Sequence, residues 1–305
     1  MKTGRYNKNK SGHGRDENRR GGKSAPIIKR RSQLEGKDDF NEAQASEKPR
    51  FEKKGNKKGT ADKSVQTESM RLNRYVSNAG VCSRRDADEL IKNGEITVNG
   101  KVVTEMGTKV SIQDDVRYKD ERLNAEKKVY ILLNKPKDVV TTLDDPHAKM
   151  TVMDILKEAC PQRIYPVGRL DKATTGLILF TNDGDLAKKL THPKHKAKKI
   201  YHVFLDKAIT ARHLDQLANG VSLEDGDIHA DAISYVEKED KTQVGVEIHS
   251  GRNRIVRRMF EHLGYKVIKL DRVFFAGLTK QGIPRGKYRE LTPKEITRLK
   301  SGFWS

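Results

Sequence analysis

The segment from Arg163 to Asp185 carries the residues best suited to chemistry, in the order R-I-Y-P-V-G-R-L-D-K-A-T-T-G-L-I-L-F-T-N-D-G-D. An apolar run leads to Asp171 at a tight turn between two strand-like stretches, with Arg169 two residues before it and Gly176 shortly after. A single ionised carboxylate presented in this way can act as a nucleophile or a general base. Asp is also common in turns, because its side chain bonds to the local backbone. By itself, the residue could therefore simply end a strand.

Two further elements carry reactive or charged side chains. Lys199-Ile-Tyr201 opens a predicted strand. Gly251-Arg-Asn-Arg-Ile-Val-Arg-Arg-Met-Phe260 opens a predicted helix, with Asn253 as its expected N-cap. On a helical projection the apolar side chains fall on one side, and the arginines fall on the other: Arg254, Arg257 and Arg258. These arginines could face RNA or a buried acid, or could simply be solvated.

Together the three elements resemble the motifs of bacterial ribosomal RNA pseudouridine synthases of the RsuA/RluB type, and they occur in that family's order and approximate spacing. The resemblance implies that Asp171 is the single catalytic aspartate and that Arg257 pairs with its carboxylate. It also implies that Tyr201 stacks on the uracil and assists removal of the C5 proton. Arg169 would support a phosphate or the flipped nucleotide.

The implied reaction breaks the bond between ribose C1′ and uracil N1, turns the base and rejoins it through C5. Because there is no net redox change and no external group, we expect no cofactor and no metal. Whether Asp171 attacks the sugar, attacks the base or assists elimination to a glycal stays open. The sequence departs from the family pattern at Ile255, where glutamine is frequent, and at Ala173, where aspartate is frequent.

The chain has 305 residues and a formal net charge of +20, which favours nucleic acid as its partner. The nucleotide must leave its helix or loop before reaction, at a cost of a few kcal/mol. Phosphate contacts are expected to offset that cost, from Lys199, Arg252, Arg254 and Arg258. With two cysteines far apart and no apolar run of membrane length, we expect a cytoplasmic protein with reduced thiols and no membrane partner.

A compact module of about fifty residues is predicted from residue 69 to residue 118. Apolar positions at helical spacing run from Leu72 to Ala79, and a second helix follows with Ser83 as its N-cap. Asn99-Gly100 then predicts a hairpin. The module resembles an S4 domain, which implies recognition of folded RNA through backbone and shape. Its candidate RNA contacts are Arg71, Arg74, Arg84, Arg85 and Lys92.

The remaining boundaries follow from composition. Residues 1–68 form a basic segment too polar to bury a core, and we expect it to lack order and to touch phosphates or to act only as a solubilising tail. Residues 119–128 are the expected linker. Residues 129–305 mix strands and helices, with strands near Val129–Pro136 and Tyr201–Leu205 and helices at 151–156 and 211–218. The expected fold class is α+β: a small S4-like domain followed by a pseudouridine synthase domain with a mixed or antiparallel sheet.

The favoured function is therefore isomerisation of a specific uridine in the large-subunit 23S ribosomal RNA. The same reaction on 16S RNA of the small subunit is an alternative. A non-catalytic RNA-binding factor of ribosome assembly on the same fold is another. In each case the expected partner is ribosomal RNA or a pre-ribosomal particle, and we expect the chain to act as a monomer.

Overall fold

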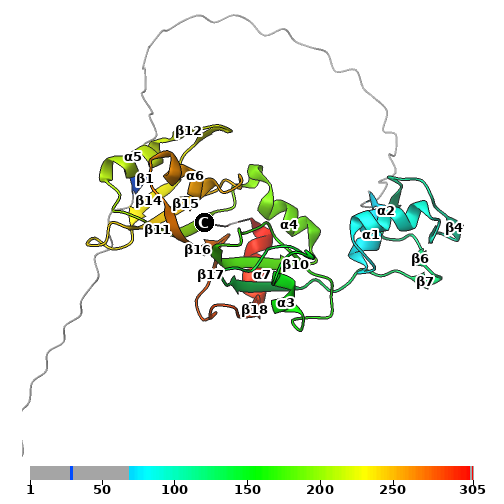
Figure 1. Cartoon of the computed structure of the whole chain (residues 1–305). Helices are drawn as coiled ribbons and strands as arrows, with labels where there is room; N and C mark the ends of the chain where they lie inside the picture. Colours follow the sequence, from blue (N-terminus) through cyan, green and yellow to red (C-terminus); the bar gives the residue numbers. More distant parts are fainter. Residues whose placement is uncertain (1–27, 30–68, 303, 305) are drawn as a thin grey trace, which may run out of the picture.

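The computed structural model describes residues 28–29, 69–302 and 304. Figure 1 shows a small domain beside a larger one that is built on a single sheet. None of the described helices is both long and apolar enough to cross a membrane.

The small domain contains the two predicted helices, α1 (Leu72–Asn78) and α2 (Arg84–Lys92). Ser83 caps α2 by accepting a hydrogen bond from the amide of Asp86, whose side chain accepts in turn from the Ser83 amide. The predicted hairpin joins β3 (Ile96–Val98) to β4 (Lys101–Val102), with Asn99 at φ 51° and Gly100 at φ 78°. These predictions are confirmed. Each of them concerned contacts within a few residues.

Four short strands complete the small domain: β2 (Ser69–Arg71), β5 (Lys109–Ser111), β6 (Val116–Tyr118) and β7 (Glu121–Arg122). Strand β7 pairs with β6, and Leu123 is buried in the same apolar cluster as Leu72 and Ile91. The domain therefore continues to Leu123, a few residues into the stretch expected to be linker.

The large domain contains a sheet in the order β1-β14-β15-β11-β16-β10-β8-β18; in addition, β9 pairs with β10 and β17 pairs with β16. Among the described strands of this sheet, β10 and β16 form the parallel pair and the other pairs are antiparallel. The expected mixed sheet is confirmed. The strands are β1 (Ile28–Lys29), β8 (Tyr130–Lys135), β9 (Tyr165–Pro166), β10 (Thr174–Thr181), β11 (Lys199–Leu205), β14 (Ala232–Tyr235), β15 (Gln243–Ile248), β16 (Val267–Phe275), β17 (Leu278–Thr279) and β18 (Tyr288–Glu290).

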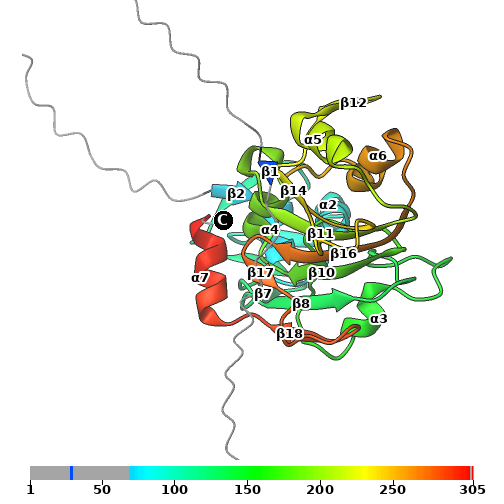
Figure 2. The same ribbon diagram turned by 90° about the vertical axis from the view of Figure 1, so that its left-hand side faces the viewer.

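Helices cover both faces of this sheet. In Figures 1 and 2, α4 (Gly184–Thr191) and α7 (Pro293–Ser301) cover one face of the half of the sheet that contains β8 and β10. Helix α3 (Val152–Leu156) covers the opposite face of that half. Successive residues of β8 accordingly join different clusters, Leu132 with α4 and α7 and Leu133 with α3. Because both faces are covered, all six residues of β8 are buried.

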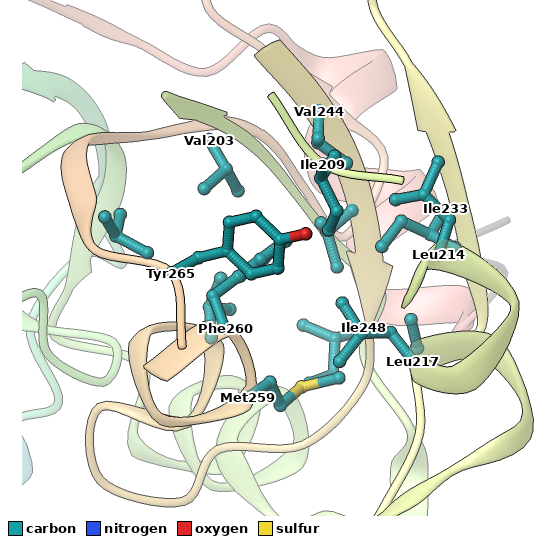
Figure 3. Packing of buried hydrophobic residues seen from close by; sticks show 14 of the residues in the cluster. Val203, Ile209, Leu214, Leu217, Ile233, Val244, Ile248, Met259, Phe260 and Tyr265 are labelled. Atoms are coloured by element: carbon teal, nitrogen blue, oxygen red, sulfur yellow. The ribbon is translucent and has the colours of Figure 1, made fainter. Parts of the chain in front are cut away.

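The other half of the sheet carries α5 (Ala211–Asn219) and α6 (Ile255–His262). Their apolar side chains pack with alternate residues of β11 and β15, as Figure 3 shows for Leu214, Met259, Phe260, Val203 and Ile248. A hairpin of β12 (Val221–Leu223) and β13 (Gly226–Ile228) follows α5. The expected helices at 151–156 and 211–218 are confirmed, and the structure shows that Thr151 and Thr210 cap them.

Strand β1 comes from the segment that was expected to lack order throughout. Ile28 pairs with Ile233 and Lys29 with Ala232, which adds a short strand at the β14 edge of the sheet. The rest of that expectation concerns residues 1–27 and 30–68, which lie outside the described residues. The expectation is therefore corrected for two residues only.

Gly176 permits the close approach of β10 to β16. A Cβ atom at this position would lie 2.3 Å from the carbonyl oxygen of Arg272 and 2.6 Å from its amide nitrogen, and the backbone φ is +106°. Both the space and the conformation therefore require glycine. Strand β10, which follows Asp171, can thus pair with β16. Strand β16 lies three strands in from the edge strand β18.

Gly176→Ala should lower the free energy of unfolding by more than about 2 kcal/mol, because the pairing of β10 with β16 must shift and the alanine must adopt a strained φ. Gly282→Ala is the matched control, since Gly282 also has a positive φ of +73° but has open space around it. Its loss should be about 1 kcal/mol. Urea unfolding measures both, and equal losses would show that the collision at Gly176 is unimportant.

Candidate active site

Asp171 lies in the turn that leads into β10, where its carbonyl oxygen accepts a hydrogen bond from the amide of Thr174 at 2.9 Å. The preceding residue is fastened by Thr141, whose hydroxyl donates to the Leu170 carbonyl at 2.9 Å. The following residue, Lys172, accepts from the Asp138 amide at 2.9 Å. The turn is thus held on both sides by the stretch that follows β8.

Lys135 strengthens this support from inside the protein. Its side chain is fully buried, and Nζ donates to the carbonyls of Pro136, Val139 and Lys172 at 3.0, 2.7 and 3.3 Å. Burial lowers the pKa of Lys135 to about 8, while Asp138 and Asp171 raise it. The lysine therefore acts as a structural tie between the end of β8 and the Asp171 turn.

The structure brings Asp171 and Arg257 together. Nε of Arg257 lies 3.9 Å from Oδ2 of Asp171, and Nη1 of Arg254 lies 4.0 Å from the same oxygen. The Asp171 side chain is 34% exposed and that of Arg257 only 8%. The carboxylate therefore faces the cavity with a buried guanidinium behind it.

Arg257 lies on the buried side of α6, so the simple division of the helix into apolar and arginine sides was wrong for this residue. Its Nη1 donates to the Val267 carbonyl at 2.8 Å, while Nε and Nη2 are buried without a hydrogen-bond partner among the described residues. Burial lowers the pKa of Arg257, and the neighbouring Arg254 lowers it further. A helix of eight residues wedged between the sheet and the Asp171 turn is buried on more than one side.

The start of α6 also differs from expectation. The N-cap is Arg254, which adopts the left-handed conformation at φ 46°, with no side-chain capping bond from any described residue. Asn253 was the expected cap. The backbone turn directs Arg254 toward Asp171 on one side and toward Glu261, 3.6 Å away, on the other.

A cavity of about 170 Å³ lies beside Asp171. Tyr201 lines it from β11, and Arg169 lines it from the Asp171 turn, with its own side chain mostly exposed. The remaining lining combines apolar and cationic groups: Val167, Gly168, Leu170, Thr174, Leu190, Thr191, Lys199, Ser250, Gly251, Arg252, Arg254, Ile255, Val256, Leu270, Arg272 and Phe275. Of the site residues suggested by the sequence, Asp171, Tyr201 and Arg169 therefore line one cavity, and Arg257 lies behind Asp171.

Lys199 lies inside this cavity, away from the surface expected for a phosphate contact. Its Nζ donates to the carbonyls of Ala197 and His249 at 3.0 and 2.9 Å. Burial lowers its pKa to about 8, with Arg272 lowering it further and Asp231 raising it. The sequence could not show this, because the carbonyl of His249 comes from the end of β15, fifty residues away.

Two of the expected phosphate contacts are engaged with the β12–β13 hairpin. Arg258 donates both terminal nitrogens to the carboxylate of Asp225 at 2.8 and 2.7 Å. Arg252 donates to the side chain and carbonyl of Asp225 at 3.0 Å each, and also to the carbonyls of Gly226 and Asp227. The two arginines keep the pKa of Asp225 far below its usual range. Contact with phosphate would require them to exchange this partner.

The small domain presents most of its candidate RNA contacts to solvent: Arg71, Arg84, Arg85 and Lys92 are exposed. Arg74 instead forms an ion pair with Asp185 at the start of α4. This arginine therefore connects the two domains. Its proposed contact with RNA would compete with that link.

Sequence reasoning missed three supporting residues. Arg272 is 3% exposed, pairs with Tyr201 across β11 and β16, and reaches the cavity. Thr141 fixes the Asp171 turn. Asp225 fixes Arg252, which precedes α6, and Arg258, which lies within it. The one signal in the sequence was Arg272 itself, which follows Asp271 within a strand-like stretch that ends in Val-Phe-Phe.

Comparison with known proteins defines the class. Residues 129–262 match the family described as RNA pseudouridylate synthase, and residues 70–116 match the S4 domain. The chain is 44% identical over 234 residues to Ribosomal large subunit pseudouridine synthase B of Bacillus subtilis (strain 168), covering 76% of this chain and 96% of that protein. It is 37% identical over 234 residues to Dual-specificity RNA pseudouridine synthase RluF of Escherichia coli (strain K12), covering 76% and 78%.

A solved structure gives the same assignment. It is described as a crystal structure of pseudouridylate synthase, with a TM-score of 0.55 and 30% identity, and it covers 75% of this chain and 99% of that one. The chain therefore belongs to the RNA pseudouridylate synthase family and carries an S4 domain. It is an RNA pseudouridine synthase, an isomerase.

Asp225→Asn should raise the affinity for RNA by about threefold to tenfold at low salt, because it removes a negative charge and frees Arg252 and Arg258 for phosphates. Asp227→Asn is the control, since it removes a charge from the same hairpin while its carboxylate contacts Ser222. Filter binding over a range of salt concentrations measures both. Equal gains for the two variants would contradict a specific release of the arginines.

Proposed function

We propose that this chain converts a uridine of large-subunit ribosomal RNA to pseudouridine, with Asp171 as the catalytic carboxylate. The observation that carries the proposal is that Asp171 and Tyr201 line one cavity, with the buried Arg257 directly behind the Asp171 carboxylate. Support for the large subunit comes from the 44% identical relative, whose name specifies that RNA. Asp171 has the exposure toward the cavity that a group reacting with an extruded nucleotide needs.

Each site residue has a role that its position supports. Arg257 pairs with the Asp171 carboxylate and fixes its orientation from the buried side. Tyr201 lines the cavity beside Asp171, where its ring can stack on the flipped uracil and its hydroxyl can assist removal of the C5 proton. Arg169 and Arg254, which are largely exposed at the cavity, are positioned to meet the phosphates that flank the nucleotide.

The chemistry of the isomerisation balances within the substrate. The bond between C1′ and N1 breaks, C1′ bonds to C5, the C5 proton leaves and N1 gains a proton. The reaction needs no redox partner, so we propose that the protein's own side chains suffice without metal or cofactor. We also propose that the chain works as a cytoplasmic monomer on ribosomal RNA or a pre-ribosomal particle, because all the site residues come from one chain.

Asp171→Asn should abolish one pseudouridine in large-subunit RNA while leaving RNA affinity within about threefold, because the amide cannot act as the ionised nucleophile or base. Asp144→Asn is the control, since Asp144 is an exposed acid outside the cavity lining. Pseudouridine mapping of both ribosomal RNAs in cells that carry each variant measures the result. A lost site in small-subunit RNA would assign the other substrate, and an unchanged map would favour a non-catalytic binding role.

We propose that the basic N-terminal segment binds phosphates of the RNA backbone. Residues 1–69 contain 19 basic and 10 acidic residues, a net charge of +9. Removing residues 1–68 should reduce the slope of log affinity against log salt by about 0.7 to 0.9 for each phosphate that the segment neutralises, without changing the modified uridine. A truncation that begins at Ile28 keeps β1 and separates its contribution. An unchanged slope would identify the segment as a solubilising tail.

A further inference from the structure

Two cations lie in the inner part of the cavity without a carboxylate partner among the described residues. Arg272 donates from Nε to the Leu177 carbonyl at 2.7 Å, and its Nη2 is buried without a partner in the described part of the chain. The Lys199 ammonium has three N–H donors, two of which reach backbone carbonyls. Both side chains therefore keep donor capacity that the described residues leave unused.

The strand register places these cations beside the expected position of the base. Lys199 and Tyr201 are two residues apart in β11 and so share one face of the sheet. Arg272 is the direct partner of Tyr201 in β16, and Leu270 and Phe275 complete this part of the lining. The guanidinium carbon of Arg272 lies 4.6 Å from the centre of the Phe275 ring. The result is a partly aromatic site with two cations in its lining.

Burying an unpaired cation is unfavourable, so a retained pair of this kind indicates a negative charge supplied by a ligand. The phosphates of an extruded nucleotide can be met at the exposed rim by Arg169 and Arg254. The inner wall faces the base. When the bond between C1′ and N1 breaks, its electron pair stays on the uracil ring, which becomes an anion with charge on its ring nitrogen and carbonyl oxygens.

We propose that Lys199 and Arg272 donate hydrogen bonds to the uracil anion that forms during the reaction and stabilise it until C5 bonds to C1′. The bonding pair that left C1′ then forms the new C5–C1′ bond, the C5 proton leaves and N1 is protonated. This inference rests on the proposed function of the same cavity. It applies whether Asp171 attacks the sugar, attacks the base or assists elimination, because the base takes negative charge in each case.

The protonation of Lys199 makes the proposal testable. Burial places its pKa at about 8; the charged groups around it are Arg272 from β16, which lowers the pKa further, and Asp231, which bonds to His249 after β15 and raises it. Below this pKa the side chain is an ammonium that can stabilise an anion, and above it the side chain is neutral. The reaction rate should therefore fall as the pH rises through about 8.

The experiment measures single-turnover rates on a ribosomal RNA transcript at saturating enzyme, with RNA affinity measured in parallel. Lys199→Met should slow the reaction by about 100-fold to 1000-fold, as expected when a donor to a developing anion is removed, and leave the affinity within about threefold. Lys199→Arg should react near the wild-type rate and lose the decline at high pH, because arginine stays charged. Lys198→Met is the matched control, since Lys198 pairs with Glu247 outside the cavity lining.

Arg272→Met should slow the reaction by a similar factor. It also removes the hydrogen bond to Leu177, so thermal unfolding is measured beside it, and Lys199→Met decides the question if the Arg272 variant does not fold.

Other outcomes overturn the proposal in distinguishable ways. If the wild-type rate rises above pH 8 and the Lys199→Arg variant lacks this rise, neutral Lys199 acts as a base. Weaker RNA binding by Lys199→Met at an unchanged single-turnover rate would make it a phosphate contact. If Asp171→Asn is inactive while Lys199→Met matches the wild type, the inference alone fails. If Asp171→Asn remains active, the proposed function of the cavity fails first.

Discussion

A single carboxylate faces an excess of cations in the cavity, and this imbalance governs the rest of the site. Two unit charges about 4 Å apart near a protein surface attract by roughly 4 kcal/mol, and the partial exposure of Asp171 reduces that value. Burying Arg257 with two unpaired guanidinium nitrogens opposes folding by several kcal/mol. The ion pair therefore does not hold α6 in place. Packing does, because Met259 and Phe260 on the same helix are fully buried in the core shown in Figure 3.

The two domains are joined by polar contacts around the turn that follows β10. Asn182 accepts from the Val129 amide at 2.9 Å and donates to Lys127 and Glu126 at 3.0 and 3.2 Å. Asp183 caps α4 and accepts from the Tyr130 hydroxyl at 2.8 Å, and burial together with this bond raises the pKa of Tyr130. The turn at Asn182 and Asp183, which follows β10, thus holds the linker against the large domain. The same turn leads into Asp185, which pairs with Arg74 of the S4 domain.

Sequence alone predicted the parts of this protein that depend on local contacts. The cap at Ser83 and the turn at Asn99-Gly100 both close within three residues. The three motifs of the candidate site were found through their resemblance to a family. The residues whose surroundings were predicted wrongly make contacts between segments that are distant in the sequence. Arg258 meets Asp225 across 33 residues, and Lys199 meets His249 across 50.

The cations of the site divide into two groups that respond differently to the solvent. Arg169 and Arg254 are exposed, so salt screens their attraction for phosphate over a Debye length of about 8 to 10 Å. Arg272 is almost fully buried and Lys199 is partly buried, so mobile ions screen them much less. Added salt should consequently weaken RNA binding far more than the chemical step within bound RNA. The fold achieves this division through strand register, because the inner cations lie on paired strands in the middle of the sheet and the outer ones on loops at its end.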